Sequence, residues 1–443
     1  MSSGPRIPSV VILGAGFGGI SAAKHLAAAV YDGTCRVTVV DRNAYHVFTP
    51  LLYETATGFV EHENVGTAKL LAAGVTVEIS SMLSRWQADF VEGEVEGVDW
   101  EGKQVLLRSQ PSVPFDYLVV ALGAETNFFG ISGLQENSFT LKSVRDADRL
   151  RQRIHDLLHK REKGIKKRME IVVGGGGATG VEFAAELTMF LRRHMVKGHL
   201  KPDDFNISLV EAQPRILGAL PPELSSYALA RLRALGVHVY LDSAVKEVAM
   251  GRVILVPRAC KPGETADQLL CDFRKEGQMT IESDLVVWTG GIRGSKTLET
   301  LGIGLDARGR RVEVGPSLEI AGKPGAFAIG DSALLMDPKT KQPVPWLAQA
   351  AMAHGAVVAR TIAARIVGGP DAVDAAYGFP KYPVIVPLGG KFAIARVDGV
   401  TLRGVWGWML KEIANLRYFL SILALPTAFK KWWHGALTYS KND

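Results

Sequence analysis

Cysteine is scarce in this chain of 443 residues: only Cys35, Cys260 and Cys271 occur, and they stand far apart. Their number and spacing exclude a disulfide framework, a CxxC redox pair and a cysteine-based zinc site. A protein without disulfides suits a reducing compartment, so we expect a cytoplasmic location.

Long apolar runs are lacking as well. No uninterrupted apolar stretch reaches the roughly 18 residues that a membrane-spanning helix needs. The first apolar run, Val10–Leu13, stops at a glycine cluster and predicts a strand, not the core of an export signal. We therefore expect any contact with a membrane to be peripheral.

Signatures of several other function classes are missing. The ten histidines show no metal-ligand spacing, so no metal is expected, and no GxSxG motif of a serine hydrolase occurs. The net charge of +6 is modest and is not gathered into one arm. It gives little support for nucleic-acid binding, but it leaves an anionic membrane surface open as a partner.

The composition is that of a well-packed enzyme with many tight turns: 47% of the residues are hydrophobic, 22% are charged, and 47 are glycines. A chain of this length is expected to form about two or three packed units.

One strand–loop–helix–strand pattern occurs twice. The first copy consists of a β run at Ser9–Leu13, the glycine loop Gly14–Gly19, an alanine-rich helix over 20–29, and a β run at Arg36–Val40 that ends on Asp41. The second copy consists of a β run at Glu170–Val173, the glycine loop Gly175–Gly180, a helix from Val181 to about Arg193, and a β run at Asn206–Val210 that ends on Glu211. Two βαβ units predict an α/β chain with two Rossmann-like dinucleotide-binding domains.

The remaining segments complete this organisation. Similar closing strands that run into glycine follow each copy, at 115–123 and 283–291. The run Phe327–Asp331 is another buried strand that ends in an acid and has no phosphate loop of its own, so we assign it to the first domain. We expect the first domain at 1–145 and 312–370, the second at 146–311, and a distinct C-terminal segment at 371–443 after a Gly/Pro-rich boundary.

The two glycine loops fit the pattern that binds a pyrophosphate. The first glycine makes the tight turn, the second lets the pyrophosphate approach, the third allows strand and helix to pack closely, and the helix N-terminus faces the phosphates. Asp41 and Glu211 stand where an acid accepts hydrogen bonds from a ribose, and Arg42 is placed to reach adenine or a phosphate. Because a carboxylate repels a 2′-phosphate, Glu211 favours NADH over NADPH, although Arg215 nearby weakens that preference.

With these loops and Asp331, the chain resembles the two-dinucleotide-binding flavoprotein reductases of the pyridine nucleotide-disulfide reductase type over nearly its whole length. Within them it looks most like a type II NADH dehydrogenase, the single-subunit NADH:quinone oxidoreductase that pumps no protons. The residues that carry this closer match are Ala44–Gly58, Gly175–Glu186 and Ala348–Gly355.

The resemblance implies non-covalent FAD in the first domain and NADH in the second. It would place FAD on Gly14, Gly16, Phe17, Gly19, Asp41, Arg42, Thr49, Pro50, Ala121, Gly123 and Asp331. It would place NADH on Gly175, Gly177, Gly180, Glu211 and Gly290. Leu122 departs mildly from the family's Ala-Thr-Gly.

Glu182 follows the second loop on the first turn of its helix, where the helix dipole favours a carboxylate. A capping acid worth about 0.3–1 kcal/mol is the structural alternative. The resemblance implies a catalytic role in contacting the nicotinamide and handling protons. We interpret Glu186, one turn later, as a structural or interdomain residue.

The quinone segment matches only in part. The family has two glutamines on one helix face, and this chain has Gln349 but Ala353 at the second position. Since groups around a quinone carbonyl must donate hydrogen bonds, the loss of one donor puts the quinone identity, its affinity or the acceptor class in doubt. His354 is a candidate replacement, or a satisfied surface histidine.

The end of the chain combines aromatic and basic residues. Those residues are Trp406, Trp408, Lys411, Arg417, Tyr418, Phe419, Phe429, Lys430, Lys431, Trp432 and Trp433. Such a mixture favours the membrane–water interface, and the apolar run Tyr418–Leu425 is too short to span, which predicts a helix in the membrane plane. Core packing or a dimer interface is the alternative.

The function that these patterns favour is a peripheral enzyme on the cytoplasmic face of the cell membrane, which passes a hydride from NADH to FAD and two electrons to ubiquinone or menaquinone. We expect a homodimer. The alternatives are a soluble flavin reductase of a carrier protein and an FAD/NAD-binding signalling protein with little turnover. Sulfide:quinone chemistry is disfavoured because no cysteine lies in the helices expected to meet the flavin.

Overall fold

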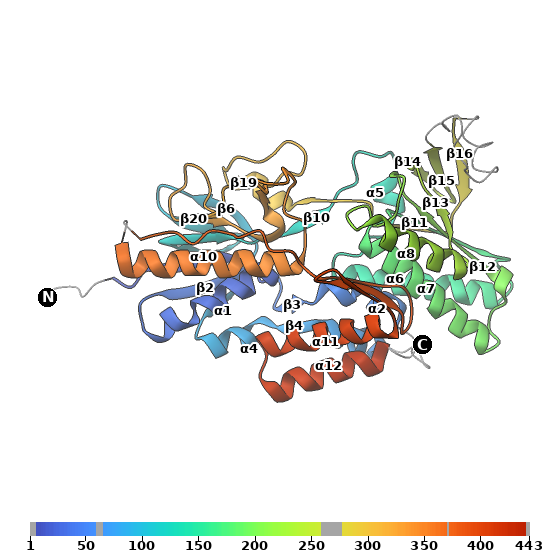
Figure 1. Cartoon of the computed structure of the whole chain (residues 1–443), viewed down its shortest axis with the longest axis horizontal. Helices are drawn as coiled ribbons and strands as arrows, with labels where there is room; N and C mark the ends of the chain where they lie inside the picture. The colour runs from blue at the N-terminus through green and yellow to red at the C-terminus, as the bar shows by residue number, and fades with distance from the viewer. Residues whose placement is uncertain (1–5, 59–64, 258–276, 370–371, 440–443) are drawn as a thin grey trace. The chain divides into compact units, whose positions relative to one another are not determined.

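The computed structural model describes residues 6–58, 65–257, 277–369 and 372–439 (Figure 1). Side chains of 65–68 and 439 are not described, and Cys260 and Cys271 lie outside the described residues. The chain forms two compact units: unit 1 comprises 1–47, 76–125 and 292–382, and unit 2 comprises 48–75, 126–291 and 383–443. The chain passes from unit 1 into unit 2 in β10 (Ala124–Thr126) and re-enters unit 1 at β18 (Ile292–Gly294).

Unit 1 is built on a five-stranded parallel sheet. In sheet order its strands are β20 (Ala326–Ala328), β9 (Tyr117–Val120), β1 (Ser9–Leu13), β2 (Arg36–Asp41) and β5 (Asp89–Glu92). The interior strands are nearly continuous runs of buried Val, Ile and Leu, as expected for a parallel sheet covered on both faces. The segment 327–331 thus contributes to the first sheet, as the sequence indicates.

Two helices, α1 (Phe17–Tyr31) and α10 (Ala348–Gly368), pack against each other in unit 1 (Figure 1). They approach so closely that a Cβ on Gly355 would lie 2.4 Å from the carbonyl oxygen of Gly18. Of the described helices, α10 alone is long and apolar enough to cross a membrane, but half of its apolar window is buried. We interpret α10 as a core helix because α1 covers its apolar side.

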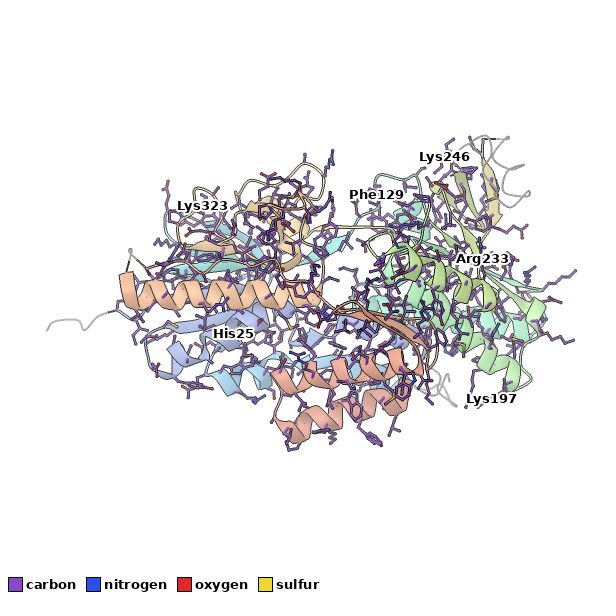
Figure 2. All side chains as sticks on the ribbon, in the orientation of Figure 1. His25, Phe129, Lys197, Arg233, Lys246 and Lys323 are labelled. Carbon is purple, nitrogen blue, oxygen red and sulfur yellow. The ribbon has the colours of Figure 1, made fainter. Side chains whose placement is uncertain are left out.

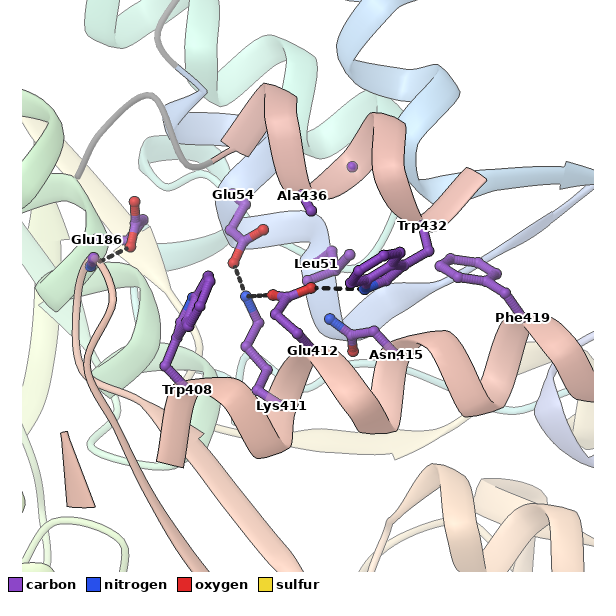
Figure 3. Close-up of a pocket in the computed structure, with 12 residues that line it drawn as sticks. Leu51, Glu54, Glu186, Trp408, Lys411, Glu412, Asn415, Phe419, Trp432 and Ala436 are labelled. Carbon is purple, nitrogen blue, oxygen red and sulfur yellow. Dashed lines mark hydrogen bonds and ion pairs between the residues drawn. The ribbon is translucent and has the colours of Figure 1, made fainter. Parts of the chain in front are cut away.

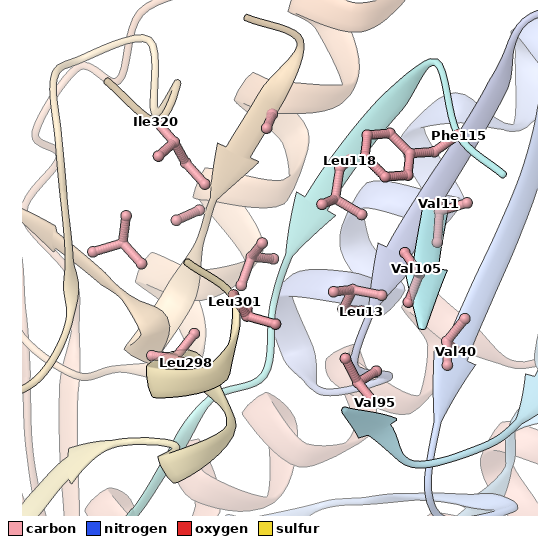
Figure 4. Close-up of a cluster of buried hydrophobic side chains, with 14 of the residues drawn as sticks. Val11, Leu13, Val40, Val95, Val105, Phe115, Leu118, Leu298, Leu301 and Ile320 are labelled. Atoms are coloured by element: carbon pink, nitrogen blue, oxygen red, sulfur yellow. The ribbon is translucent and has the colours of Figure 1, made fainter. Parts of the chain in front are cut away.

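A hydrophobic cluster covers the other face of the parallel sheet in unit 1 (Figure 4). Val11 and Leu118 of the sheet pack there with Val105 of a three-stranded antiparallel sheet and with Leu301. The other elements of this unit are β3 (Tyr45–Val47), β4 (Thr76–Glu78), α4 (Ile79–Leu83), η2 (Ser84–Trp86), β6 (Val95–Asp99), β7 (Gln104–Leu107), β8 (Gln110–Pro114), η4 (Lys296–Thr300), β19 (Val312–Val314), η5 (Gly330–Ser332) and β21 (Ala333–Leu335).

Unit 2 repeats the plan with a four-stranded parallel sheet. Its strands, in sheet order, are β13 (His238–Tyr240), β12 (Phe205–Val210), β11 (Met169–Gly174) and β17 (Leu285–Trp288). The helices around it are α5 (Leu134–Asn137), α6 (Val144–Glu162), α7 (Ala178–Val196), η3 (Pro202–Asp204) and α8 (Pro222–Ala234). An antiparallel sheet of β14 (Ser243–Ala249), β15 (Arg252–Pro257) and β16 (Met279–Glu282) closes a second core with residues such as Val172 and Trp288.

Charged side chains of unit 2 such as Lys197, Arg233 and Lys246 are exposed (Figure 2). The last part of this unit combines an early segment with the C-terminus. The early segment contains η1 (Thr49–Leu51), α2 (Leu52–Thr57) and α3 (Val65–Val75), and the C-terminal part contains β22 (Val384–Pro387), β23 (Ala393–Val397), β24 (Val400–Gly404), α11 (Val405–Ile422) and α12 (Leu425–Tyr439). Helix α2 packs on α6 and α7, and α12 packs on α3 and α11.

The compact units follow boundaries different from those expected at 1–145 with 312–370, 146–311 and 371–443. The segment 48–75 groups with unit 2, and so does the C-terminal segment from 383 onward. The cause is visible in the packing, because α12 packs on α3 and Lys411 of α11 forms an ion pair with Glu54 of α2. The assignment of a cofactor to each domain remains a prediction.

Candidate dinucleotide-binding loops and a buried charge cluster

The first glycine loop links β1 to α1 in unit 1. Gly14 has φ +102°, and a Cβ there would lie 2.4 Å from the carbonyl oxygen of Ala121. A Cβ on Gly19 would lie 1.9 Å from the Gly14 carbonyl oxygen, so strand and helix can meet only through glycine. No described atom lies within 4 Å of a Cβ built on Gly16. The loop therefore has two tightly packed glycines around one open position.

The second glycine loop, between β11 and α7, has the same geometry in unit 2. Gly175 has φ +106°, and a Cβ there would lie 2.4 Å from the Cα of Gly290. A Cβ on Gly180 would lie 1.9 Å from the Gly175 carbonyl oxygen, whereas one on Gly177 meets no described atom within 4 Å. The repeat in the sequence is thus a repeat of backbone geometry.

The two predicted ribose acids bind the backbone of their own loops. The Oδ2 atom of Asp41 accepts a hydrogen bond from the amide of Ala15 at 2.8 Å. In unit 2 the Oε2 atom of Glu211 accepts one from the amide of Gly176 at 2.6 Å. These bonds orient each carboxylate beside its phosphate loop, and its remaining lone pairs suit a ribose diol.

The two arginines near these acids have different surroundings. Arg42 is exposed beside Asp41. Arg215 donates hydrogen bonds to the carbonyl oxygens of Gly218 at 2.7 Å and Leu220 at 3.1 Å. The guanidinium of Arg215 is therefore engaged within its own loop.

Both helix entrances suit a pyrophosphate. Gly16 and Gly177 are the N-cap residues of α1 and α7, and neither provides a side chain to accept the first helical amides. Those amides and the positive end of the helix dipole favour a bound anion, and the open space at each N-cap glycine lets it come close. The residues present therefore fit a dinucleotide at each loop.

Two other predicted flavin residues of unit 1, Gly123 and Asp331, have hydrogen-bond partners outside the predicted set. Ser332 is fully buried, and its hydroxyl accepts a hydrogen bond from the amide of Gly123 at 2.8 Å, which joins the closing strand to the Asp331 turn. The indole of Trp346 donates to the carbonyl oxygen of Asp331 at 3.3 Å. Ser332 and Trp346 belong to no motif recognisable in the sequence, so these two contacts could not be predicted.

Phe17 lies edge-on to the buried ring of His46, with centroids 5.2 Å apart, and the Nδ1 atom of His46 lies 2.8 Å from the carbonyl oxygen of Ala15. His46 was not singled out as a site residue, although it stands in the matched stretch 44–58. Thr49 and Pro50 belong to η1 of unit 2 and are exposed.

The predicted quinone residues lie on the first half of α10. Gln349 and Ala353 are half-buried. His354 is buried, its Nδ1 accepts a hydrogen bond from the amide of Gly330 at 3.1 Å, and its ring packs edge-on against Tyr377. Burial lowers the pKa of His354 to about 4. The side chain is therefore a neutral core residue that supports the Gly330 turn, and not a surface histidine.

Glu182 stands one turn into α7 and is half-buried. Burial raises the pKa of its carboxyl group to about 8, the positive charge of Lys411 opposes this rise, and the negative charge of Glu54 adds to it. Among the described residues its side chain has no hydrogen bond or salt bridge. A carboxyl group with a pKa raised toward neutral pH is suited to accept and release a proton.

Three charged side chains of unit 2 form a buried cluster, which we call the Lys411 cluster: Glu54, Lys411 and Glu412 (Figure 3). The ammonium of Lys411 forms an ion pair with Glu54 and a second one of 3.2 Å with Glu412. Burial by itself would lower the pKa of Lys411, but the two carboxylates raise it, with a net upward shift. Lys411 therefore stays charged.

Neighbouring side chains complete this region. The hydroxyl of Tyr53 donates to Glu54 at 2.9 Å, and the indole of Trp432 donates to Glu412 at 3.1 Å. Glu186, which is buried as expected for a structural residue, accepts a hydrogen bond from the amide of Gly390 at 3.2 Å. The cluster thus ties α2, α11 and α12 together.

The aromatic and basic residues of the C-terminal segment fall into a buried set and an exposed set. Lys411 is 8% exposed, and Tyr418 and Phe419 are buried against Phe48, with ring centroids 4.9 and 5.1 Å away. The prediction that these three face a membrane is wrong, because their partners come from α2 and the residues before it. The large apolar residues that are exposed on the two helices are Val405, Trp406, Met409, Ile413, Leu420, Leu425, Phe429, Trp433 and Leu437. Their helical spacing makes one apolar stripe on each helix.

Relatives and solved structures resemble the chain over nearly its full length. It is 29% identical over 443 residues to the type II NADH:quinone oxidoreductase Ndh of Mycobacterium tuberculosis, covering 97% of this chain and 88% of that protein. It is 29% identical over 425 residues to the type II NADH:quinone oxidoreductase of Staphylococcus aureus, covering 95% and 98%. The resemblance to such proteins inferred from the motifs is confirmed.

The structure of NDH2 from Plasmodium falciparum in complex with NADH superposes with a TM-score of 0.80 at 17% identity, covering 98% of this chain and 99% of that one. The sulfide:quinone oxidoreductase of Aquifex aeolicus superposes with a TM-score of 0.73 at 19% identity, covering 97% and 92%. At these identities the superpositions establish the fold, as predicted. The sequence profile of the pyridine nucleotide-disulphide oxidoreductases matches residues 8–355, so the chain belongs to that family.

Proposed function

We propose that this protein is an FAD-dependent NADH:quinone oxidoreductase of the type II class, which does not pump protons. FAD is assigned to the glycine loop of unit 1 and NADH to that of unit 2. The observation that carries the proposal is the duplicated loop, in which Asp41 and Glu211 are each oriented by a backbone amide beside an open N-cap glycine. The names of the relatives from M. tuberculosis and S. aureus support the same activity.

When bound, the flavin supplies the chemistry of accepting a hydride from NADH and passing two electrons on. The chain orients both dinucleotides through the amides of α1 and α7, and Asp41 and Glu211 hold the riboses. Glu182 holds or releases a proton at its carboxyl group, as its raised pKa allows. Gln349 donates a hydrogen bond toward the reduced acceptor.

We assign the acceptor to a membrane quinone and the enzyme to the cytoplasmic face of the membrane. The support is the apolar stripe of α11 and α12, where Trp406 is 68% exposed and Trp433 58% exposed. Tryptophan at this density suits the headgroup region, and exposed Lys430 and Arg417 suit anionic lipid. A homodimer interface is the other arrangement that would cover the stripe.

The test is anaerobic reduction of the purified, FAD-loaded protein by NADH, followed by a short-chain ubiquinone or menaquinone in detergent. Rapid bleaching of the flavin absorbance and rapid recovery are expected. Slow bleaching would contradict the assignment of NADH to unit 2, and bleaching without recovery would contradict the quinone. NADPH as the control donor should reduce the flavin more slowly, because Glu211 repels its 2′-phosphate.

The membrane assignment has a separate test. The double variant Trp406→Ser/Trp433→Ser should bind less to vesicles of mixed anionic and neutral phospholipid, and it should keep its rate of flavin bleaching by NADH. Unchanged vesicle binding together with dissociation of a wild-type dimer would show that the stripe is a subunit interface.

A further inference from the structure

The positive charge of the chain is concentrated where two segments of unit 2 meet. The segments are 159–168, from the end of α6 to the residue before β11, and 192–204, from the end of α7 through η3. Together they contain ten lysine and arginine residues and three acidic residues, a net charge of +7, whereas the whole chain has a net charge of +6. The rest of the chain is therefore close to neutral. We call the surface formed by these two segments the basic surface.

Two contacts join the halves of the basic surface. The Nδ1 atom of His199 lies 3.8 Å from the Oε1 atom of Glu162. The guanidinium of Arg161 forms an ion pair with the carboxylate of Asp204, 43 positions later in the chain. The basic residues of the two segments are therefore neighbours in space although they are far apart in the sequence.

Only part of this positive charge is neutralised within the protein. Lys166, for example, forms an ion pair of 2.5 Å with Asp284. Lys160, Lys163 and Lys167 are exposed, and none of these three has an ion-pair partner among the residues that the structure describes. Like charges that are crowded on one surface repel each other, and an anionic partner would relieve that repulsion.

Two exposed aliphatic side chains lie among the basic residues. Ile165, which is 72% exposed, follows Lys163 and precedes Lys167, and Val196, which is 85% exposed, directly precedes Lys197. Figure 2 labels Lys197 on the lower side of unit 2, the side toward which α12 lies in Figure 1. A basic surface with apolar tips suits a lipid bilayer, because the lysines meet anionic headgroups and the aliphatic side chains enter the layer below them.

We propose that the basic surface of unit 2 binds the anionic headgroups of a phospholipid membrane, as a second contact in addition to the apolar stripe of α11 and α12. Its charges include many lysines, which are compact point charges without a fixed fork geometry, and this suits a fluid layer of headgroups. Single-stranded nucleic acid fits less well, because its bases stack on aromatic side chains and the two segments contain no phenylalanine, tyrosine or tryptophan. The inference goes beyond the proposed function, since it depends on neither the flavin nor the quinone.

The experiment measures how the FAD-loaded, full-length protein sediments with vesicles of neutral phosphatidylcholine and with vesicles that also contain anionic phosphatidylglycerol. The triple variant Lys160→Gln/Lys163→Gln/Lys167→Gln should lose about 100-fold in affinity for the anionic vesicles, since each lysine near an anionic surface contributes about fivefold. Its affinity for the neutral vesicles should stay that of the wild-type protein. The affinity of the wild-type protein for anionic vesicles should fall as salt is added, because salt screens exposed charges.

The matched control is Arg233→Gln/Lys246→Gln/Arg252→Gln, which removes the same charge from exposed side chains of unit 2 outside the basic surface. This control should bind both kinds of vesicle as the wild-type protein does. A further variant, Ile165→Ser/Val196→Ser, keeps every charge. It should lose about tenfold in affinity for anionic vesicles, because two aliphatic side chains no longer enter the membrane.

The proposal is overturned if the triple lysine variant binds anionic vesicles as tightly as the wild-type protein, or if the control loses as much affinity as the triple variant. Tighter binding of the wild-type protein to a single-stranded RNA homopolymer than to anionic vesicles at the same salt concentration, lost in the triple variant, overturns the choice of a membrane as the partner. Flavin bleaching by NADH should be the same in the triple variant and the wild-type protein. If the wild-type protein is not bleached at all, the proposed function fails, while the ratio of the two vesicle affinities still decides the role of the basic surface.

Discussion

The two glycine loops have nearly the same backbone, yet their helices differ at the second residue after the last glycine. In unit 1 this residue is Ser21, whose hydroxyl donates to the carbonyl oxygen of Met352 at 2.7 Å and joins α1 to α10. In unit 2 it is Glu182, whose pKa is raised by burial and by the charge of Glu54 and lowered by the charge of Lys411. One copy uses this position to pack a helix, and the other places a titratable group there. A dinucleotide loop therefore predicts where phosphate binds, and the residues that follow decide whether the helix also takes part in chemistry.

A glycine-to-alanine substitution in one loop should abolish the binding of the dinucleotide assigned to that loop and leave the other loop intact. These are the largest effects that we expect. Gly19→Ala places a Cβ 1.9 Å from a carbonyl oxygen, and overpacking of this kind costs about 1–3 kcal/mol or more. The protein should be recovered without FAD. Gly180→Ala has the equivalent clash in unit 2, and it should retain FAD but fail to be reduced by NADH.

Flavin absorbance after gel filtration and the NADH bleaching rate measure the two outcomes. Gly315→Ala is the control, since no described atom lies within 4 Å of a Cβ there. Loss of FAD from both loop variants would mean that the two copies do not act independently.

Substitutions at the equivalent positions Glu182 and Ser21 should affect different properties, turnover in the first case and stability in the second. Glu182→Gln keeps the shape of the side chain and removes its titration, so quinone reduction should fall about 100-fold or more with normal flavin content. Ser21→Ala removes one hydrogen bond, so it should cost about 1 kcal/mol of unfolding free energy and leave turnover unchanged. Steady-state turnover and urea unfolding distinguish the two. A large loss of turnover in Ser21→Ala would remove the contrast between the copies.

Removal of the predicted ribose acid Glu211 should affect NADH, whereas removal of Asp41 should affect FAD. Glu211→Ala removes a charged hydrogen-bond acceptor, so the KM for NADH should rise about tenfold and the preference over NADPH should shrink. Asp41→Ala should instead weaken retention of FAD and leave the preference between the nucleotides unchanged. Kinetics with both nucleotides and flavin release on dilution provide the measurements. An unaltered nucleotide preference in Glu211→Ala would argue against the ribose contact.

The parts of the molecule that could be predicted are those whose signals are local. The strand Ser9–Leu13 is found at the predicted residues, because a continuous apolar run that stops at a glycine loop defines both of its ends. The strand at Arg36–Asp41 and the acids Asp41 and Glu211 follow from the same short-range pattern. Each such feature depends on residues within one βαβ unit.

The Lys411 cluster could not be predicted, because Lys411 and Glu54 are 357 positions apart. A lysine among aromatic residues is typical of a membrane interface, and nothing in the local sequence distinguishes a buried lysine from an exposed one. The same reasoning failed for Tyr418 and Phe419, which pack on Phe48. Contacts between distant segments, which decide the environment of Glu182, require the fold.

The smallest effect expected is a pH dependence of stability that belongs to the second copy alone. The pKa of Glu182 in the folded protein is about 8, above its ordinary value of 4.5. Between these values the folded protein keeps a proton that the unfolded chain has released, so the contribution of Glu182 to stability is full below about pH 4.5 and declines as the pH rises to about 8. With partial exposure of the carboxyl group taken into account, the loss of unfolding free energy between pH 5 and pH 7 should be about 1 kcal/mol.

Urea unfolding of the wild-type protein and of Glu182→Gln at pH 5 and at pH 7 measures this loss. Relative to the wild-type protein, Glu182→Gln should be more stable at pH 7 than at pH 5 by about 1 kcal/mol. Ser21→Ala, the equivalent change in unit 1, is the control, and its stability relative to the wild-type protein should not depend on pH. If the difference in unfolding free energy between Glu182→Gln and the wild-type protein is also independent of pH, Glu182 is ionised in the folded protein at neutral pH.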